Sequence, residues 1–215
     1  MSDKVAPRPF AAPPFLAMLE QLIDRMRRSR PAPMDQVLAE ASVLVPVTKD
    51  RHEPEIILTR RALTMNSHAG EVAFPGGKKD DTDVDLLATA LRESEEEIGL
   101  ARNAVQIVGQ LAQLRSRAGI KVTPWVGLVA PDVALTANPQ ELDTIFRVPL
   151  RFFLENPPQN DHLVRWMGNE FLMPTWRHGE HVIWGLTAYI IVDLLNTVYD
   201  AGLAMPMPAA QTTAS

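Results

Sequence analysis

Four glutamates lie close together near the middle of the chain, in the run Arg92-Glu93-Ser94-Glu95-Glu96-Glu97. If this run is helical, Glu93 and Glu97 lie one turn apart on one face, and Glu96 lies beside them. Like charges at this spacing repel each other and destabilise an isolated helix. Carboxylate oxygens are also the ligands that hard divalent cations prefer. The run therefore predicts a helix whose acidic face is compensated by a bound metal ion.

Glycines stand on both sides of this acidic run. The segment Phe74-Pro75-Gly76-Gly77 precedes it, and its two glycines allow positive φ angles and a close approach of the backbone to the site. Gly99 follows the acids and is suited to cap the C-terminus of a helix. We therefore expect a helix from Asp85 or Leu86 to Ile98. Its inner face is expected to carry Leu87, Leu91 and Ser94, opposite the acids.

The acidic run resembles the second half of the Nudix box, the signature of the Nudix hydrolases. That pattern is Gly, five residues, Glu, seven residues, then Arg-Glu-apolar-x-Glu-Glu-x-Gly-apolar. The segment from Arg92 to Leu100 fits it, with Ser94 where an aliphatic residue is usual. The resemblance implies that Glu93 and Glu97 are metal ligands, with Glu96 next. It also implies that Arg92 holds the glutamates or the loop by ion pairing, in preference to binding phosphate.

The first half of the box departs from the pattern. Counting back from Arg92 places Val84 at the glutamate position and Lys78 at the glycine position. If Gly77 is the box glycine instead, the loop is one residue longer. Asp83 is then the acid nearest to the missing glutamate. This departure weakens any role of the first acid and leaves the metal-binding half intact.

A second resemblance concerns the segments Leu58-Thr59-Arg60-Arg61-Ala62 and Gly70 to Gly77. They resemble the motif that precedes the box in coenzyme A pyrophosphatases, with Asn66 where that motif has a second arginine. The segments Thr89 to Glu93 and Trp184 to Ala188 resemble this subfamily too. The resemblance implies hydrolysis of coenzyme A, or of its acyl derivatives, to 3′,5′-ADP and (acyl-)4′-phosphopantetheine. Mg²⁺ or Mn²⁺ would neutralise the diphosphate and acidify a bound water.

Several substrate-binding residues and several general bases remain open. The cations available for phosphate are Arg60, Arg61 and Arg115, with Arg117 and Lys121 as further candidates, and Gly76 and Gly77 line the approach to the site. Because Arg60 and Arg61 alternate across a strand, only one of them can face the site. The general base is Glu71, Glu141 or Glu96, or else metal-bound hydroxide acts without a side-chain base. A negative charge at Glu141 also suits a helix N-terminus, which is its structural alternative.

Two other functions compete with this one. The first is hydrolysis of another nucleoside diphosphate, such as ADP-ribose or a dinucleoside polyphosphate. The second is a degenerate Nudix domain that binds a nucleotide or a partner without turnover. The altered first half of the box motivates both alternatives, and Asn66 adds to the first. The intact Glu93, Glu96 and Glu97 argue against the second.

The composition limits the other classes of function. A chain of 215 residues with 46% hydrophobic residues is large enough for one sizeable core. Its net charge of -5 argues against partners such as nucleic acid or a membrane surface. Without cysteine there can be no disulfide, thiolate nucleophile or cysteine-ligated zinc. The N-terminus lacks the apolar segment of a signal peptide, so we expect a cytoplasmic protein with a small-molecule substrate.

The elements that must position the site are expected in a single domain over residues 15–202. Tails at 1–14 and 203–215 are expected to be disordered or flexible. Within the domain we expect an N-terminal amphipathic helix at 15–28, at most to residue 30, which is either a contact of a homodimer or packed on its own domain. Strands are expected at 41–48, 55–61, 105–114 and 121–129, a short helix at 139–146, a hairpin turn at 177–180 and a last helix at 185–199. This order predicts an α/β or α+β layered sandwich. The family resemblance implies a Nudix-type α/β/α sandwich with a mixed sheet between helices.

Overall fold

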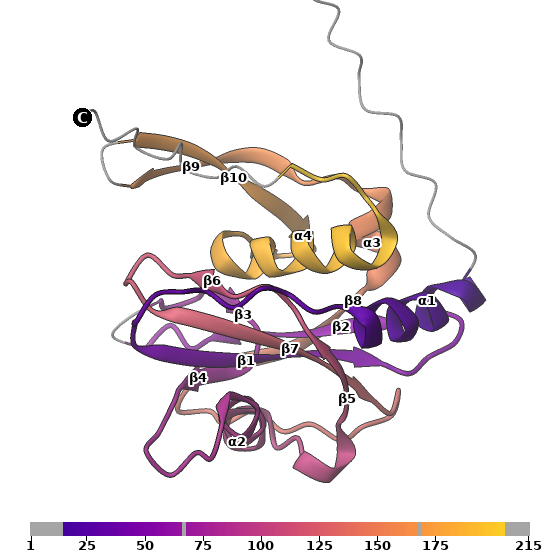
Figure 1. The fold of residues 1–215 in the computed structure, drawn as a ribbon, viewed down its shortest axis with the longest axis horizontal. Coiled ribbons are helices and arrows are strands. Elements are labelled where there is room, and N and C mark those ends of the chain that lie inside the picture. Colours follow the sequence, from indigo (N-terminus) through magenta and orange to yellow (C-terminus); the bar gives the residue numbers. More distant parts are fainter. Residues whose placement is uncertain (1–14, 66–67, 167–168, 205–215) are drawn as a thin grey trace, which may run out of the picture.

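A mixed β-sheet lies between helices in the computed structural model, which describes residues 15–65, 68–166 and 169–204 (Figure 1). The sheet contains β1 (Glu40–Thr48), β2 (Glu55–Arg61), β3 (Val72–Ala73), β4 (Gly76–Lys78), β5 (Gln106–Gln110), β6 (Leu114–Arg115), β7 (Lys121–Val129) and β8 (Leu142–Pro149). Helices α1 (Phe15–Arg28) and α4 (Gly185–Tyr199) cover one face of it, and α2 (Leu86–Ile98) covers the other (Figure 1). The fold is the expected α+β sandwich.

The remaining elements complete the two outer layers. They are the short 3₁₀ helix η1 (Arg102–Ala104), the helix α3 (Leu150–Glu155), and a separate sheet of β9 (Gln159–Trp166), β10 (Asn169–His178) and β11 (His181–Ile183). The sequence patterns predict neither α3 nor β9. No helix among the described residues is both long enough and apolar enough to cross a membrane.

The strand β1 is the centre of the large sheet. It runs parallel to β7 along its whole length, from Glu40 opposite Lys121 to Thr48 opposite Val129. On its other side, its first half pairs with β4, and Val47 in its second half pairs with Ile56 of β2. This arrangement places the glycines of β4 over α2 and next to the end of β2.

The sheet separates two hydrophobic layers. Along β1, Val45 and Val47 contribute to the larger layer, beneath α1 and α4, whereas Leu44 contributes to the smaller layer against α2. This alternation follows from the two-residue period of a strand. Since both faces are covered, β1 is almost continuously buried, as expected for a strand in the middle of a sandwich.

The N-terminal helix packs on its own domain. Met18, Leu22 and Met26 on its apolar face are fully buried. The hydroxyl of Tyr199 donates a hydrogen bond to the carbonyl oxygen of Met18 at 3.0 Å, which joins α1 to α4. The apolar face of α1 is therefore occupied within the chain, which leaves it unavailable as a dimer contact.

Most predicted elements are present at their predicted positions, but the short helix at 139–146 is wrong. Residues 139–141 form a turn, and β8 follows from Leu142 to Pro149. Asn138 has the chemistry of a helix cap, yet its side chain accepts the backbone N–H of Gln140 at 3.1 Å within this turn. The segment after it then pairs with β2 from Glu55 to Arg61. Long-range pairing outweighs the local capping signal.

The strand predicted at 105–114 is also divided. It forms β5 and β6, separated at residues 111–113. The register of β5 with β7 shifts between Ile107 and Gly109. Next to the break, the backbone N–H of Ala112 donates to Asp193 of α4 at 3.0 Å instead of to a strand. At this point a side-chain carboxylate takes the place of a strand carbonyl as the acceptor of the backbone N–H.

Candidate active site

The two loop glycines let β4 lie directly against the acidic helix. Gly76 has φ +153, and a Cβ built there would lie 2.3 Å from the carbonyl oxygen of Ser42. A Cβ at Gly77 would lie 2.4 Å from the carboxylate of Glu93. A side chain at Gly76 would collide with the backbone of β1, and one at Gly77 would displace the carboxylate of Glu93 on α2. The two glycines therefore allow β4 to approach β1 and α2 closely.

The helix α2 begins and ends at local signals. Asp85 is its N-cap and accepts the backbone N–H of Ala88 at 2.7 Å. Gly99 is its C-cap in the left-handed conformation, with φ 65. Both bounds agree with those expected from the sequence. The side chains of Glu93, Glu96 and Glu97 therefore project from a helix that is fixed at both ends.

The acids of α2 do not all lie opposite the core. Ser94 is buried, as expected, and Leu87 and Leu91 are half-buried. Glu97 is buried as well, with 3% of its surface exposed, so the expectation that the acids face away from the core is wrong for this residue. Glu97 is next to Ile98 and one turn after Glu93. At this place on the helix its side chain points toward the junction of β4 and β2.

Burial controls the ionisation of Glu97. Desolvation raises its pKa to about 7. The backbone N–H of Gly76, which donates to Glu97 Oε2 at 3.0 Å, and the charge of Arg61 act in the opposite direction. The charges of Glu93 and Glu141 raise the pKa further. The cations near Glu97 therefore do not compensate the negative charge of the carboxylates around it.

The neighbouring Glu93 shows the same imbalance. Desolvation raises its pKa, and the charges of Glu96 and Glu141 add to the effect, while Arg92 lowers it. Glu141, which lies in the turn before β8, is therefore close enough to act electrostatically on both Glu93 and Glu97. Four carboxylates, from α2 and from this turn, converge on one region.

Arg92 cannot supply the missing charge to a ligand, because all five of its N–H donors are already used. Nε and Nη2 donate to the two oxygens of Asp83 at 3.0 and 2.9 Å. Nη1 donates to Glu93 at 2.9 Å and to Glu96 at 3.1 Å. The second Nη2 proton is directed at the carbonyl oxygen of Lys78, at 3.3 Å. This geometry agrees with the ion-pairing role implied for Arg92 by the family resemblance.

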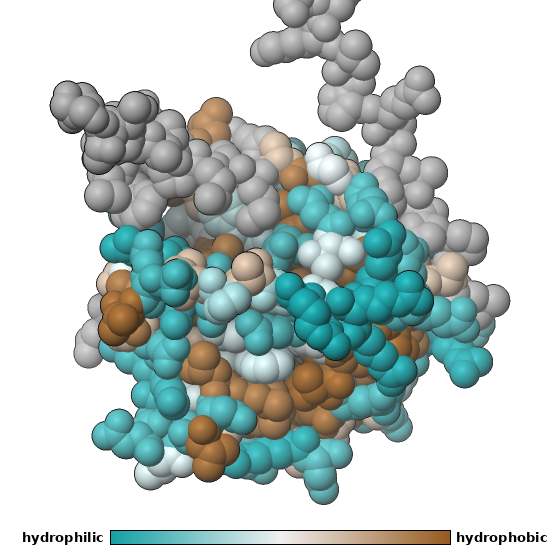
Figure 2. Space-filling view, viewed as in Figure 1, coloured by the Kyte–Doolittle hydropathy of each residue, from teal (hydrophilic) through white to brown (hydrophobic). Residues whose placement is uncertain are grey.

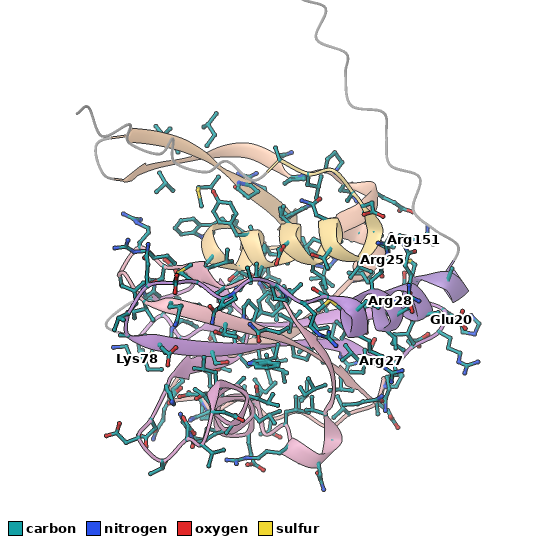
Figure 3. The ribbon with its side chains drawn as sticks, in the orientation of Figure 1. Glu20, Arg25, Arg27, Arg28, Lys78 and Arg151 are labelled. Carbon is teal, nitrogen blue, oxygen red and sulfur yellow. The ribbon has the colours of Figure 1, made fainter. Side chains whose placement is uncertain are left out.

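Lys78 marks the end of β4 and therefore the position of this site in the molecule (Figure 3). The arginines of α1, namely Arg25, Arg27 and Arg28, lie at the opposite end of the sheet in the same view (Figure 3). Among them Arg25 is paired with Asp200 and Arg28 with Asp24. The basic end of α1 is thus no part of the acidic site. In the space-filling view the visible surface near α2 alternates between hydrophilic and hydrophobic residues (Figure 2).

The adjacent arginines at the end of β2 point to opposite faces of the sheet, as the strand period predicts. Arg60 is on the α4 side, where its guanidinium bonds Asp143 at 2.8 and 3.1 Å and lies 3.4 Å from Glu180. Arg61 is on the α2 side, where its Nη1 lies 3.8 Å from Glu97 Oε1. Its buried Nε has no hydrogen-bond partner among the described residues. Of these two arginines, Arg61 is the one brought to the acidic cluster.

The other predicted site residues lie at different distances from the cluster. Glu71 directly precedes β3, and its backbone oxygen accepts the N–H of Arg61 at 3.0 Å, so it lies beside the end of β2. Its carboxylate contacts His68 Nδ1 at 2.8 Å. Arg115 is exposed on β6, which pairs with β7 and is separated from β4 by β7 and β1. Three inter-strand spacings amount to about 14 Å. Asn66 lies outside the described residues.

Sequence reasoning missed the partners that fix these arginines. Asp143 and Glu180 neutralise Arg60, although they are far from it in the sequence. The hydroxyl of Thr89 donates a hydrogen bond to Asp83 at 2.9 Å, and no local sequence pattern predicts this bond. Such partners become visible only when the register of the strands and the path of the loop are known.

The carboxylates of α2 have the chemistry to bind a hard divalent ion. Among the described residues, the partner of Glu97 Oε1 is Arg61 at 3.8 Å, so this oxygen retains acceptor capacity toward the site. Within the described ranges, no three His, Asp or Glu side chains are arranged as a complete metal site on their own. Mg²⁺ commonly takes one or two protein carboxylates and completes its shell with water and substrate phosphate. The residues present fit such a partial set.

Comparisons with known proteins identify the family of this chain. The NUDIX domain model matches residues 39–180. The Nudix hydrolase NudL of Photorhabdus laumondii is 40% identical over 183 residues, which cover 84% of this chain and 97% of that protein. NudL of Cronobacter sakazakii is 39% identical over 180 residues, covering 84% of this chain and 91% of that protein. These names specify a hydrolase family and no substrate.

The fold has solved counterparts as well. A MutT/nudix family protein from Enterococcus faecalis superimposes with a TM-score of 0.50 over 80% of this chain and 66% of that chain, at 15% identity. This similarity supports the fold alone. The family model and the relatives carry the assignment further: the chain belongs to the Nudix hydrolases, enzymes that hydrolyse diphosphate bonds.

Proposed function

We propose that this Nudix hydrolase is a Mg²⁺- or Mn²⁺-dependent diphosphatase of coenzyme A or its acyl derivatives, releasing 3′,5′-ADP and (acyl-)4′-phosphopantetheine. The observation that carries the reaction class is the cluster of Glu93, Glu97 and Glu141 with insufficient positive charge, next to the two glycines of β4. The substrate assignment rests on the sequence resemblance of the segments at 58–62 and 70–77 to coenzyme A pyrophosphatases.

Glu93 and Glu97 are the proposed metal ligands, with Glu96 as a third. Glu97 is buried, and the cation nearest to its Oε1 in the described part of the chain is Arg61, at 3.8 Å. Glu96 is exposed and already accepts a hydrogen bond from Arg92. A bound divalent ion would neutralise negative charge on the diphosphate and lower the pKa of a coordinated water. The same charge would offset the desolvation of Glu97.

Arg61 is the proposed phosphate-binding residue. Its guanidinium is largely buried, with 23% of the side chain exposed, and its ion pair with Glu97 is long at 3.8 Å. Leaving a buried N–H without an acceptor costs about 1–3 kcal/mol, and a phosphate oxygen would remove this cost. Arg60 lacks such a vacancy because Asp143 and Glu180 hold it on the other face.

Glu141 is the proposed general base. Its charge acts on both proposed metal ligands, so its carboxylate lies in the electrostatic range of the reacting water. Glu71 is paired with His68, and Glu96 is held by Arg92. Of the three carboxylates, Glu141 thus acts on both Glu93 and Glu97 and has no ion pair with a cation of the described ranges.

The decisive experiment incubates the purified protein with coenzyme A and Mn²⁺, with and without EDTA, and separates the products by chromatography. Metal-dependent formation of 3′,5′-ADP supports both the reaction and the substrate. If coenzyme A and acetyl-coenzyme A stay intact, ADP-ribose and a dinucleoside polyphosphate are tested under the same conditions. Turnover of one of these retains the diphosphatase and rejects coenzyme A. Ligand binding in calorimetry without any product would instead indicate a binding-only domain.

A further inference from the structure

Asp83, in the loop between β4 and α2, has a buried carboxylate that accepts several hydrogen bonds. Only 4% of its side chain is exposed, although the residues around it in the loop are largely exposed. Its two oxygens accept hydrogen bonds from Arg92 Nε at 3.0 Å and Nη2 at 2.9 Å. Oδ2 also accepts from Thr89 Oγ1 and from the backbone N–H of Asp80, both at 2.9 Å. A buried carboxylate that accepts four hydrogen bonds is held in one position.

Arg92 connects the fixed carboxylate of Asp83 to the acids of α2. A guanidinium is planar and rigid, so two bonds to Asp83 on one edge also fix the position of Nη1 on the other. That nitrogen donates to Glu93 at 2.9 Å and to Glu96 at 3.1 Å. Without Asp83, Arg92 would keep its bonds to Glu93 and Glu96 and the longer one to the carbonyl oxygen of Lys78, but it would lose the two bonds that fix the plane of the guanidinium. The orientation of the Glu93 carboxylate would then be less tightly fixed.

We propose that Asp83 is a positioning residue for the metal site, which through Arg92 fixes the carboxylate of Glu93 in the orientation that binds the ion. This inference rests on the proposed metal-dependent function. It assigns a role to the segment in which the chain departs from the family pattern. Asp83 is one methylene shorter than the glutamate of that pattern, and the loop after Gly77 is one residue longer. With both departures present, Asp83 accepts two hydrogen bonds from Arg92.

Asp83 also anchors its loop, so a test must separate positioning from anchoring. Asp83→Asn keeps the volume of the side chain but places an amide N–H₂ or a neutral oxygen against the guanidinium. Asp80→Asn is the matched control, since Asp80 holds Thr82 in the same loop through its side chain and makes no hydrogen bond to Arg92. A loop-anchoring role alone would change thermal stability in both variants and leave the affinity for metal unchanged.

The experiment is a Mn²⁺ titration of the full-length, metal-free protein by calorimetry, without substrate. Losing an outer partner of a metal ligand typically weakens metal binding by about 10–100-fold, and we expect a Kd change of this size in Asp83→Asn. Asp80→Asn is expected to bind like the wild type. In an Arg92→Ala background, Asp83→Asn is expected to cause no further change in Kd, because the connecting guanidinium is gone.

The outcomes distinguish this inference from the proposed function. Wild-type Kd in Asp83→Asn, with Mn²⁺ binding still lost in Glu97→Gln, overturns the positioning role and leaves the diphosphatase standing. A wild-type protein that binds no Mn²⁺ and hydrolyses no substrate overturns the proposed function itself. If Asp83→Asn does not fold, Thr89→Val removes one bond to Asp83 without touching Arg92. We expect about threefold weaker Mn²⁺ binding from the loss of one such hydrogen bond, and an unchanged Kd would overturn the inference.

Discussion

Arg60 and Arg61 are neighbours in the sequence, yet they lie in opposite electrostatic environments. On the α4 face, Arg60 is held by Asp143 and Glu180, and its charge is compensated within the protein. On the α2 face, the carboxylates of Glu93, Glu97 and Glu141 outnumber the available cations, and Arg61 has a buried Nε without a partner among the described residues. The charges on one face of the sheet are compensated within the described structure, and those on the other face are not.

This difference explains how a single strand serves both stability and function. Compensated charges restrict motion and contribute modestly to stability when they are partly exposed. Uncompensated charges cost stability, and proteins retain them where a ligand supplies the missing charge. Changes on the α2 face are therefore expected to alter catalysis more than folding, and changes on the α4 face the reverse.

The largest expected effect follows from Glu97→Gln. This change removes the charge of a proposed metal ligand while keeping its size and its ability to accept from Gly76. We expect kcat for coenzyme A to fall by about three orders of magnitude, since charge stabilisation by the metal contributes several kcal/mol to the transition state. The measurement is steady-state release of 3′,5′-ADP, with circular dichroism to verify the fold.

A matched control lies on the same helix. Glu95 is exposed and pairs with Arg102 at 3.1 Å, away from the acidic cluster. Glu95→Gln is expected to retain wild-type kcat within about twofold, as surface substitutions usually do. Near-wild-type turnover in Glu97→Gln would show that the ligand assignment is wrong.

The next effect sharpens the comparison between the two arginines. Arg61→Ala is expected to lower kcat/KM by about 100-fold, because a charge-assisted contact to phosphate is worth roughly 1.5–3 kcal/mol. Arg60→Ala is expected to change kcat/KM by less than about threefold. Initial rates over a range of coenzyme A concentrations give both values. Equal losses in the two variants would remove the assignment of Arg61 to the phosphate.

A loss of kcat is also expected to distinguish Glu141 from Glu71 as the general base. Glu141→Gln is expected to lower kcat for coenzyme A by about 10²-fold, the typical contribution of a general base. Glu71→Gln is expected to retain kcat close to the wild-type value, because Glu71 is paired with His68 at 2.8 Å. Steady-state release of 3′,5′-ADP by the two variants provides the comparison. Near-wild-type kcat in Glu141→Gln would favour metal-bound hydroxide without a side-chain base.

How much of this site can be predicted from the sequence depends on how local its signals are. The helix α2 is predicted within one residue because Asp85 and Gly99 cap it through contacts inside the segment itself. The alternation of Arg60 and Arg61 also follows from the strand period. Which of the two faces the acids does not follow, since this depends on the pairing of β2 with β3 and β8.

Long-range contacts also account for the failures. The segment after Asn138 has the cap residues of a helix, but its pairing with β2 makes it a strand. Glu141 consequently lies in a turn beside the acidic cluster and not in the first turn of a helix. Asp83 is identified by sequence only as the acid nearest to a missing glutamate. Its bonds to Arg92 and Thr89 depend on the path of the loop.

The smallest expected effect is the pH dependence of stabilisation by metal. Burial raises the pKa of Glu97 to about 7 in the metal-free protein, above the ordinary value of 4.5. The folded state therefore binds more protons than the unfolded state between these values, so this group destabilises the fold as pH rises from about 4.5 to 7. A metal ion binds the ionised carboxylate and removes this loss. Stabilisation by Mg²⁺ should thus be larger at pH 8 than at pH 5.5, by about 2–3 kcal/mol at most.

Thermal unfolding with and without Mg²⁺ at these two pH values measures that difference. For a chain of this size, about 2 kcal/mol corresponds to roughly 4–8 °C in Tm. Taking the difference between metal-bound and metal-free protein at each pH cancels the titration of carboxylates elsewhere in the fold. Glu97→Gln has no charge to lose at this position, so its metal-free form should unfold at a higher temperature than the wild type at pH 8 and gain little from Mg²⁺. A wild-type gain that is equal at both pH values would mean that Glu97 is ionised throughout. The α2 face would then already hold enough positive charge without a metal.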